Sequence, residues 1–177
     1  MTGFADLLLS TIAATDVACL RIAGDDTARV TTIAKTLLPL AQERDIAVLL
    51  DDTDLTVKLQ ADGVHLSDPT LYAKARRSVG AEGIVGVACP LERHTAMEVS
   101  EAGADYVQFS VTTETEAEAL DLIAWWTEMM TVPSVVAAVF TPETAKAFVA
   151  AGVDFLAPSP TIWSAPDPVK AIAALLS

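Results

Sequence analysis

The chain has 177 residues, of which 52% are hydrophobic, and 24 acidic against 11 basic side chains give it a formal net charge of −13. This length fits a single domain over residues 1–177, and the acidic surplus argues against nucleic acid and anionic membrane as partners, because either needs a concentrated positive field. No apolar run approaches the roughly 20 residues of a membrane helix, and no basic flank of a signal peptide is present, so we expect a cytoplasmic protein.

Helical and extended patterns alternate from the start of the chain, and the first element is a helix. Pro39 should kink or split the long helix that contains it, because proline lacks a backbone N–H and crowds the preceding turn. In order, the first half predicts a helix over 4–14, a strand over 17–22, a helix over 25–44, a strand over 46–50, a helix over 55–59, a strand over 63–66 and a helix that begins at Asp68 and Pro69.

The second half continues the same alternation, which brings the total to seven strands and eight helices. The strands are mostly apolar, which is typical of a parallel sheet that is covered on both faces. Cys19 and Cys89 fall in strands, so we expect reduced, buried thiols. The strands of this half are predicted over 84–88, 106–109, 134–139 and 155–157, and the helices over about 90–102, up to about 130, from about 141 and at the C-terminus.

A short phrase, Ala and then Asp before an apolar run, occurs four times, and its aspartates are Asp16, Asp62, Asp105 and Asp154. Each interval of roughly 45 residues holds two strands and two helices, which is the period of a (β/α) barrel. A complete barrel begins with a strand. We therefore expect an incomplete TIM-type α/β barrel that lacks its first strand, and a homodimer, because an open sheet edge invites pairing.

The string Ala-Asp-Gly-Val-His-Leu over residues 61–66 is the most distinctive motif, and Asp51 and Asp52 end the predicted strand before it. Both features resemble the thiamine phosphate synthases, in which an Asn-Asp pair ends one strand and Ala-Asp-Gly-Val-His-Leu forms the next. The resemblance spans nearly the whole chain from residue 7. It continues over residues 86–88, 102–107 and 141–143 and reaches Ser159.

The resemblance implies a TIM-type barrel whose site lies at the carboxyl ends of the strands. It also implies a transferase of thiamine biosynthesis, which joins a pyrimidine methyl diphosphate to a thiazole phosphate while pyrophosphate leaves, with Mg²⁺ on the diphosphate. Such a reaction needs cations around the leaving group, because negative charge develops there.

By this resemblance, Arg21 matches an arginine that faces the diphosphate, but the family's glutamine two residues earlier is Cys19, and its lysine two residues later is an alanine. Asp51 matches the metal-binding aspartate. The second acidic ligand falls at Thr70, for which Asp68 substitutes only if the loop shifts.

Three further family positions have lost their usual residues. A histidine beyond the fourth predicted strand is Pro90, and the loop over residues 113–118 carries acidic residues where the family has a lysine. A Gly-Gly pair that lets backbone N–H groups approach a phosphate is Ala138-Val139, whose side chains block that approach.

Each candidate also has an ordinary structural interpretation. An ion pair with Asp51 or Asp52 explains Arg21 as well as an anion site does. The position of His65 inside a strand favours a core histidine over a catalyst. Asp52 is expected to face solvent or to cap the following short helix.

Three more residues lie near the predicted mouth of the barrel. Gln108 and Ser110 replace small residues of the family and fill the mouth or contact a ligand, and Ser159 offers a backbone contact to phosphate or is a plain loop residue. The candidate substrate-binding residues are Arg21, Asp51, His65, Gln108, Ser110 and Ser159, and the candidate metal ligands are Asp51 and Asp68.

Two functions follow from these residues. The favoured hypothesis is a noncatalytic or altered homologue that keeps a role in binding a small ligand, such as a phosphorylated molecule, or a partner. The alternative is an active synthase that uses Mg²⁺. The synthase hypothesis requires the side chains of Arg21 and Asp51 to converge on one open pocket.

Overall fold

The computed structural model describes residues 2–176, and over this range the chain forms one parallel sheet of seven strands in the order β1 to β7. Each strand pairs in parallel with its neighbours in the sequence. The predicted strands are confirmed, and their ends differ from the prediction by at most two residues. The strands are β1 (Cys19–Ile22), β2 (Ala47–Leu50), β3 (Gly63–Leu66), β4 (Ile84–Cys89), β5 (Tyr106–Ser110), β6 (Ser134–Ala138) and β7 (Phe155–Pro158).

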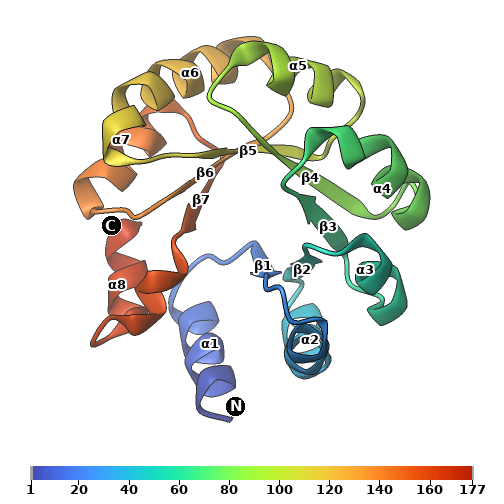
Figure 1. The fold of residues 1–177 in the computed structure, drawn as a ribbon. Helices are drawn as coiled ribbons and strands as arrows, with labels where there is room; N and C mark the ends of the chain where they lie inside the picture. Colours follow the sequence, from blue (N-terminus) through green and yellow to red (C-terminus); the bar gives the residue numbers. More distant parts are fainter. Residues whose placement is uncertain (1, 177) are drawn as a thin grey trace.

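Helices follow the strands and line the outside of the curled sheet (Figure 1). Helix α2 is continuous through Pro39, so the prediction of a split is wrong. Pro39 removes one hydrogen bond near the end of this helix, whose inner face is buried along its length. The α-helices are α1 (Thr2–Ala14), α2 (Thr27–Gln42), α3 (Thr53–Leu59), α4 (Tyr72–Val79), α5 (Arg93–Glu101), α6 (Glu116–Met129), α7 (Pro142–Ala151) and α8 (Pro168–Leu175), and the 3-10 helices are η1 (Pro69–Leu71), η2 (Thr113–Thr115) and η3 (Pro160–Ser164).

The sheet is curled but not closed. Within residues 2–176, β1 pairs only with β2 and β7 only with β6, so the expected absence of a first strand is confirmed. Helices α1 and α8 lie side by side where the two ends of the sheet approach each other (Figure 1). The rings of Phe4 and Trp163 meet edge to face there, with centroids 5.2 Å apart. The chain is therefore an incomplete TIM-type barrel.

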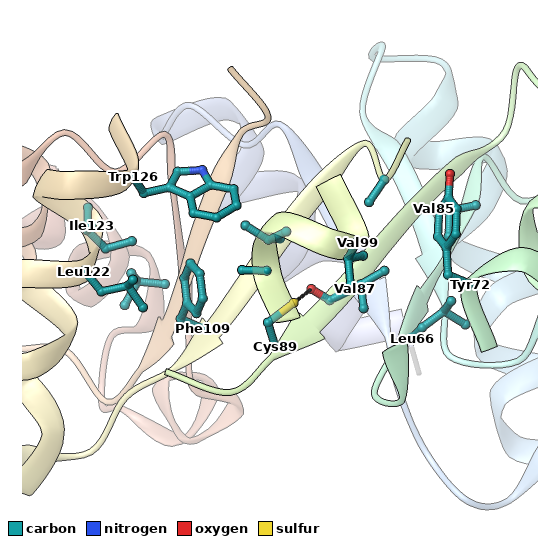
Figure 2. Packing of buried hydrophobic residues seen from close by; sticks show 14 of the residues in the cluster. Leu66, Tyr72, Val85, Val87, Cys89, Val99, Phe109, Leu122, Ile123 and Trp126 are labelled. Carbon is teal, nitrogen blue, oxygen red and sulfur yellow. Dashed lines mark hydrogen bonds between the residues drawn. The ribbon is translucent and has the colours of Figure 1, made fainter. Parts of the chain in front are cut away.

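Alternate residues of each strand point to opposite faces of the sheet. One face packs on the helices: Val85, Val87 and Cys89 of β4 belong to an apolar cluster that also holds Phe109 and Trp126 (Figure 2). The rings of those two aromatic residues meet edge to face at 5.9 Å. The other face lines the inside of the curled sheet, and it carries Arg21, His65, Gly86, Tyr106 and Gln108.

Three of the four repeated aspartates have one shared structural role. Each accepts a hydrogen bond from a backbone N–H of the strand before its own, and so joins two strands at their amino ends. Asp16 precedes β1, and within residues 2–176 no earlier strand is present for it to bind. The bonds run from Val48 N to Asp62 Oδ2 at 2.7 Å, from Val85 N to Asp105 Oδ2 at 2.7 Å and from Ser134 N to Asp154 Oδ2 at 2.8 Å.

The two cysteines differ in exposure. Cys89 is buried, as expected, but Cys19 is exposed, so the prediction of a second buried thiol is wrong. Cys19 lies on β1, whose outer edge has no strand partner within residues 2–176. Among the described residues, no helix is long and apolar enough to cross a membrane.

Candidate functional site

Arg21 and Asp51 form a bidentate ion pair at the carboxyl ends of β1 and β2. Nε of Arg21 donates to Oδ1 of Asp51 at 2.7 Å, and Nη2 donates to Oδ2 at 2.9 Å. The strand register sets Arg21 opposite Leu49, two residues before Asp51. The two side chains are 37% and 34% exposed. The predicted ion pair is thus present, at the mouth where the resemblance expects the site.

The residues present do not fit a protein-held Mg²⁺. This ion takes several oxygen ligands in octahedral geometry, but Asp51 already carries the guanidinium of Arg21. Asp68 caps η1 instead, because its Oδ1 accepts from the backbone N–H and the hydroxyl of Thr70 at 2.9 and 2.7 Å. Within residues 2–176, no group of three or more His, Cys, Asp or Glu side chains is placed to hold a metal.

A pocket of about 190 Å³ lies beside Asp51. Its three carboxylates face one basic side chain, that of Lys74, and Arg21 does not line it. Asp52 caps α3, as expected, by accepting from Leu55 N at 2.8 Å. The remaining lining residues are Thr53, Asp54, Leu66, Leu71 and Ala75.

A second pocket, of about 250 Å³, lies beyond the carboxyl ends of β5 and β6. Glu114 and Glu116 line it together with threonines and apolar side chains, and no basic residue does. Val139, at one position of the family's Gly-Gly pair, also lines it and is 76% exposed.

His65 is held on the inner face of the sheet by Tyr106, a residue that the sequence analysis missed. Nδ1 of His65 and the Tyr106 hydroxyl are 2.7 Å apart, and the two rings stack with centroids at 5.8 Å. Gly86 makes room for this arrangement: a Cβ there would lie 1.8 Å from Cζ of Tyr106. Gly86 pairs with Tyr106 in the register, and this pairing is the signal for Tyr106, which becomes visible only once the register is known.

The environment of His65 keeps its ring neutral. The side chain is 1% exposed, and burial followed by the positive charge of Arg21 lowers its pKa from 6.5 to about 4, against the opposing carboxylate of Asp51. His65 is therefore both a core histidine, as favoured, and a neighbour of the charges at the mouth.

This pKa predicts a pH dependence of stability. The unfolded chain binds the proton of His65 more readily than the folded one, so stability is complete above the unfolded pKa and falls as pH drops from 6.5 toward 4. Between pH 7 and pH 5 we expect this residue to cost about 2 kcal/mol of unfolding free energy. Urea unfolding at both pH values, in wild type and in His65→Gln, measures this contribution.

The exposed His94 supplies the matched control, since its side chain is 82% exposed. His94→Gln controls for the loss of an exposed histidine, and the change in unfolding free energy from pH 7 to pH 5 should be smaller in His65→Gln than in this control. An equal change in unfolding free energy from pH 7 to pH 5 in wild type and His65→Gln would contradict the assignment.

The other three candidates lie on β5 and after β7. Gln108 is buried on the inner face, and Ser110 is exposed at the end of its strand. Ser159 caps η3, and its backbone N–H donates to the carbonyl of Ala138 at 2.8 Å, so that N–H is already engaged. Among the described residues, Arg21 and Asp51 are bonded to each other, and these three residues form no hydrogen bond with either of them.

The sequence model of the thiamine monophosphate synthase family matches residues 4–162 of the chain. The chain belongs to this family. Its relatives include the thiamine-phosphate synthase of Rhodospirillum centenum, which is 42% identical over 97% of this chain and 88% of its own length. A second relative, the thiamine-phosphate synthase of Erythrobacter litoralis, is 36% identical over 81% of this chain and 72% of its own length.

Solved structures show the same fold. Thiamine phosphate pyrophosphorylase from Pyrococcus furiosus superposes with a TM-score of 0.81 at 23% identity, covering 97% of this chain and 87% of that one. A 3-hexulose-6-phosphate synthase superposes with a TM-score of 0.69 at 21% identity, covering 97% and 90%. At these identities the likeness extends to the fold alone.

Proposed function

We propose that the chain is an altered member of its family, which keeps a small-ligand site at the mouth of the sheet but does not join a pyrimidine methyl diphosphate to a thiazole phosphate. The bidentate pair of Arg21 and Asp51 carries this proposal. The resemblance assigns the first residue to the diphosphate and the second to Mg²⁺. Here the two side chains neutralise each other, so Asp51 is not free for the metal, and only Nη1 of Arg21 is left for an anion.

The charge around the mouth supports the same proposal. A diphosphate and a second phosphate bring several negative charges together, and these must be stabilised as pyrophosphate leaves. The pocket beside Asp51 sets one lysine against three carboxylates, and the larger pocket is lined by two glutamates. In a chain of net charge −13, these surroundings repel such a pair of substrates.

The backbone at the mouth gives further support. Phosphate binding by main-chain N–H groups needs a close approach, which glycine permits and a side chain hinders. Ala138 and Val139 carry side chains at those positions, and the N–H of Ser159 is already bonded to Ala138. A single small anionic group beside Arg21 is the ligand that these residues tolerate best.

An active synthase is the second candidate, and one observation favours it. The relative from Rhodospirillum centenum, which is named a synthase, matches almost the whole chain at 42% identity. Arg21 and Asp51 contact each other at the mouth and are partly exposed, although only Asp51 lines a pocket, so the two do not converge on one open pocket as that hypothesis requires.

Calorimetry with pyrimidine methyl diphosphate, with and without Mg²⁺, and a coupling assay for thiamine phosphate separate the two candidates. The Rhodospirillum centenum relative serves as the positive control in both. We expect no Mg²⁺-dependent binding of the diphosphate and no thiamine phosphate. Micromolar, Mg²⁺-dependent binding together with turnover would overturn the altered homologue and establish the synthase.

A homodimer is a further part of the proposal. The unpaired edges of β1 and β7 support it, because exposed sheet edges favour association. Sedimentation equilibrium of the full chain measures the mass directly, and a monomer at micromolar concentration would rule this part out.

A further inference from the structure

We propose that His65 is a ligand-binding residue and that Tyr106 positions it, so that Nε2–H donates a hydrogen bond to a single oxyanion, a carboxylate or phosphate group, bound beside Arg21. This inference rests on the proposed function, because it names the ligand chemistry of the same mouth. It assigns roles to Tyr106 and Gly86 that go beyond the family resemblance.

The Tyr106 ring occupies the space over Gly86. A Cβ added at Gly86 would lie 1.8 Å from Cζ of Tyr106. From there the hydroxyl reaches Nδ1 of His65 at 2.7 Å. A residue larger than glycine at position 86 would displace the phenol, so the strand pairing itself builds this contact.

One proton is shared between the Tyr106 hydroxyl and Nδ1 of His65. A phenol has one proton to donate, and Nδ1 is the one hydrogen-bond partner of the Tyr106 hydroxyl within residues 2–176. A phenol O–H is a stronger donor than the N–H of a neutral imidazole, and an imidazole nitrogen is a stronger acceptor than a phenol oxygen. The hydroxyl therefore donates to Nδ1, and the neutral ring carries its own proton on Nε2. The low pKa of His65 agrees with a neutral ring.

Nε2 of His65 has no hydrogen-bond partner in the described chain. Every fully buried side-chain nitrogen or oxygen in that part of the chain does have a partner. Nε2 is therefore not sealed off, although His65 as a whole is 1% exposed. The small accessible part of the ring includes an N–H donor that no protein atom uses.

The charge that acts most strongly on His65 is that of Arg21. Nη1 of Arg21 is likewise unbonded within residues 2–176, since Nε and Nη2 hold Asp51. Arg21 pairs with Leu49 and Leu49 pairs with Gly63, so Arg21 and His65 lie on the same face of the sheet with only β2 between their strands. The charges of Arg21 and Asp51 also act on the pKa of His65. Their net charge is zero, which accommodates one oxyanion better than a diphosphate.

Nitrogen-15 NMR of the full-length chain tests both parts. In the ligand-free protein, the ring of His65 should show the tautomer with the proton on Nε2. Titration with inorganic phosphate in one arm and acetate in the other, at constant ionic strength set by chloride, should shift the Nε2 signal saturably in at least one arm. The arm that saturates identifies the oxyanion.

Tyr106→Phe should weaken this binding about tenfold and lose the single tautomer. Tyr72→Phe is the matched control, because the Tyr72 hydroxyl bonds Arg76 on the helical side of the sheet. A proton on Nδ1 in the wild type, or an Nε2 signal that neither anion shifts, overturns the inference without any variant. Turnover in the coupling assay would overturn the proposed function and leave the tautomer unaffected, so the two failures are distinguishable.

Discussion

Asp105→Ala should lower the free energy of unfolding by about 3 kcal/mol, whereas Asp16→Ala should change it by less than about 0.5 kcal/mol. Asp105 accepts from the buried N–H of Val85 at 2.7 Å and also pairs with Arg76. Removing its carboxylate leaves a buried amide without a partner and a partly buried guanidinium without its counter-charge. Asp16 is exposed at the equivalent point of the repeat, and the described part of the chain has no strand before it.

Urea unfolding of both variants and the wild type measures this difference. The comparison is internally matched, because the two aspartates occupy the same position of one repeated phrase. A loss of more than about 1 kcal/mol in Asp16→Ala would mean that this carboxylate has a partner that the described chain does not supply. An equally small effect in both variants would show that the aspartates do not hold the strands together.

Asp51→Asn should strengthen the binding of inorganic pyrophosphate at least about tenfold in the absence of metal. The substitution removes the negative charge that occupies two donors of Arg21 at 2.7 and 2.9 Å. The guanidinium is then available to an anion. Under the synthase hypothesis the opposite holds, because loss of the metal-binding carboxylate weakens Mg²⁺-dependent binding of a diphosphate.

Asp52→Asn is the control for this experiment. Asp52 lies in the same pocket and carries the same charge, but its carboxylate caps α3 through Leu55 N and does not contact Arg21. Asparagine caps a helix as well as aspartate does, so the variant removes one charge and leaves the Arg21 pair intact. Calorimetry with pyrophosphate should show a clearly larger gain in Asp51→Asn. Equal gains in both variants would mean that bulk charge, and not the release of Arg21, controls anion binding.

The arrangement of the elements was open to prediction because its causes are local. Apolar runs and helical spacing located all seven strands, and the repeated aspartates marked the period of the barrel. The prediction of a split at Pro39 was wrong because it considered this residue alone. Burial of the whole inner face of α2 keeps the helix continuous. Cys19 was misjudged because exposure on β1 depends on a strand that is absent from the sheet.

The candidate site was open to prediction only in part. The resemblance identified Arg21, Asp51 and His65 as candidates, and the ion pair was one of two stated outcomes for Arg21. The same residues gave no indication of Tyr106, because a tyrosine in an apolar strand has no distinctive pattern. Its role depends on Gly86 in the neighbouring strand, and the cross-strand partner of a residue is known only when the register of the strands is known.

The amino-acid sequence was therefore sufficient for the alternation of strands and helices, the period of the repeat, the missing first strand and membership of the family. These properties depend on residues that are close together along the chain, or on similarity between this amino-acid sequence and those of the family. The partners at the mouth required the folded chain. Arg21 and Asp51 are 30 residues apart, and His65 and Tyr106 are 41 apart, so the pairing of parallel strands alone brings each pair within hydrogen-bond distance.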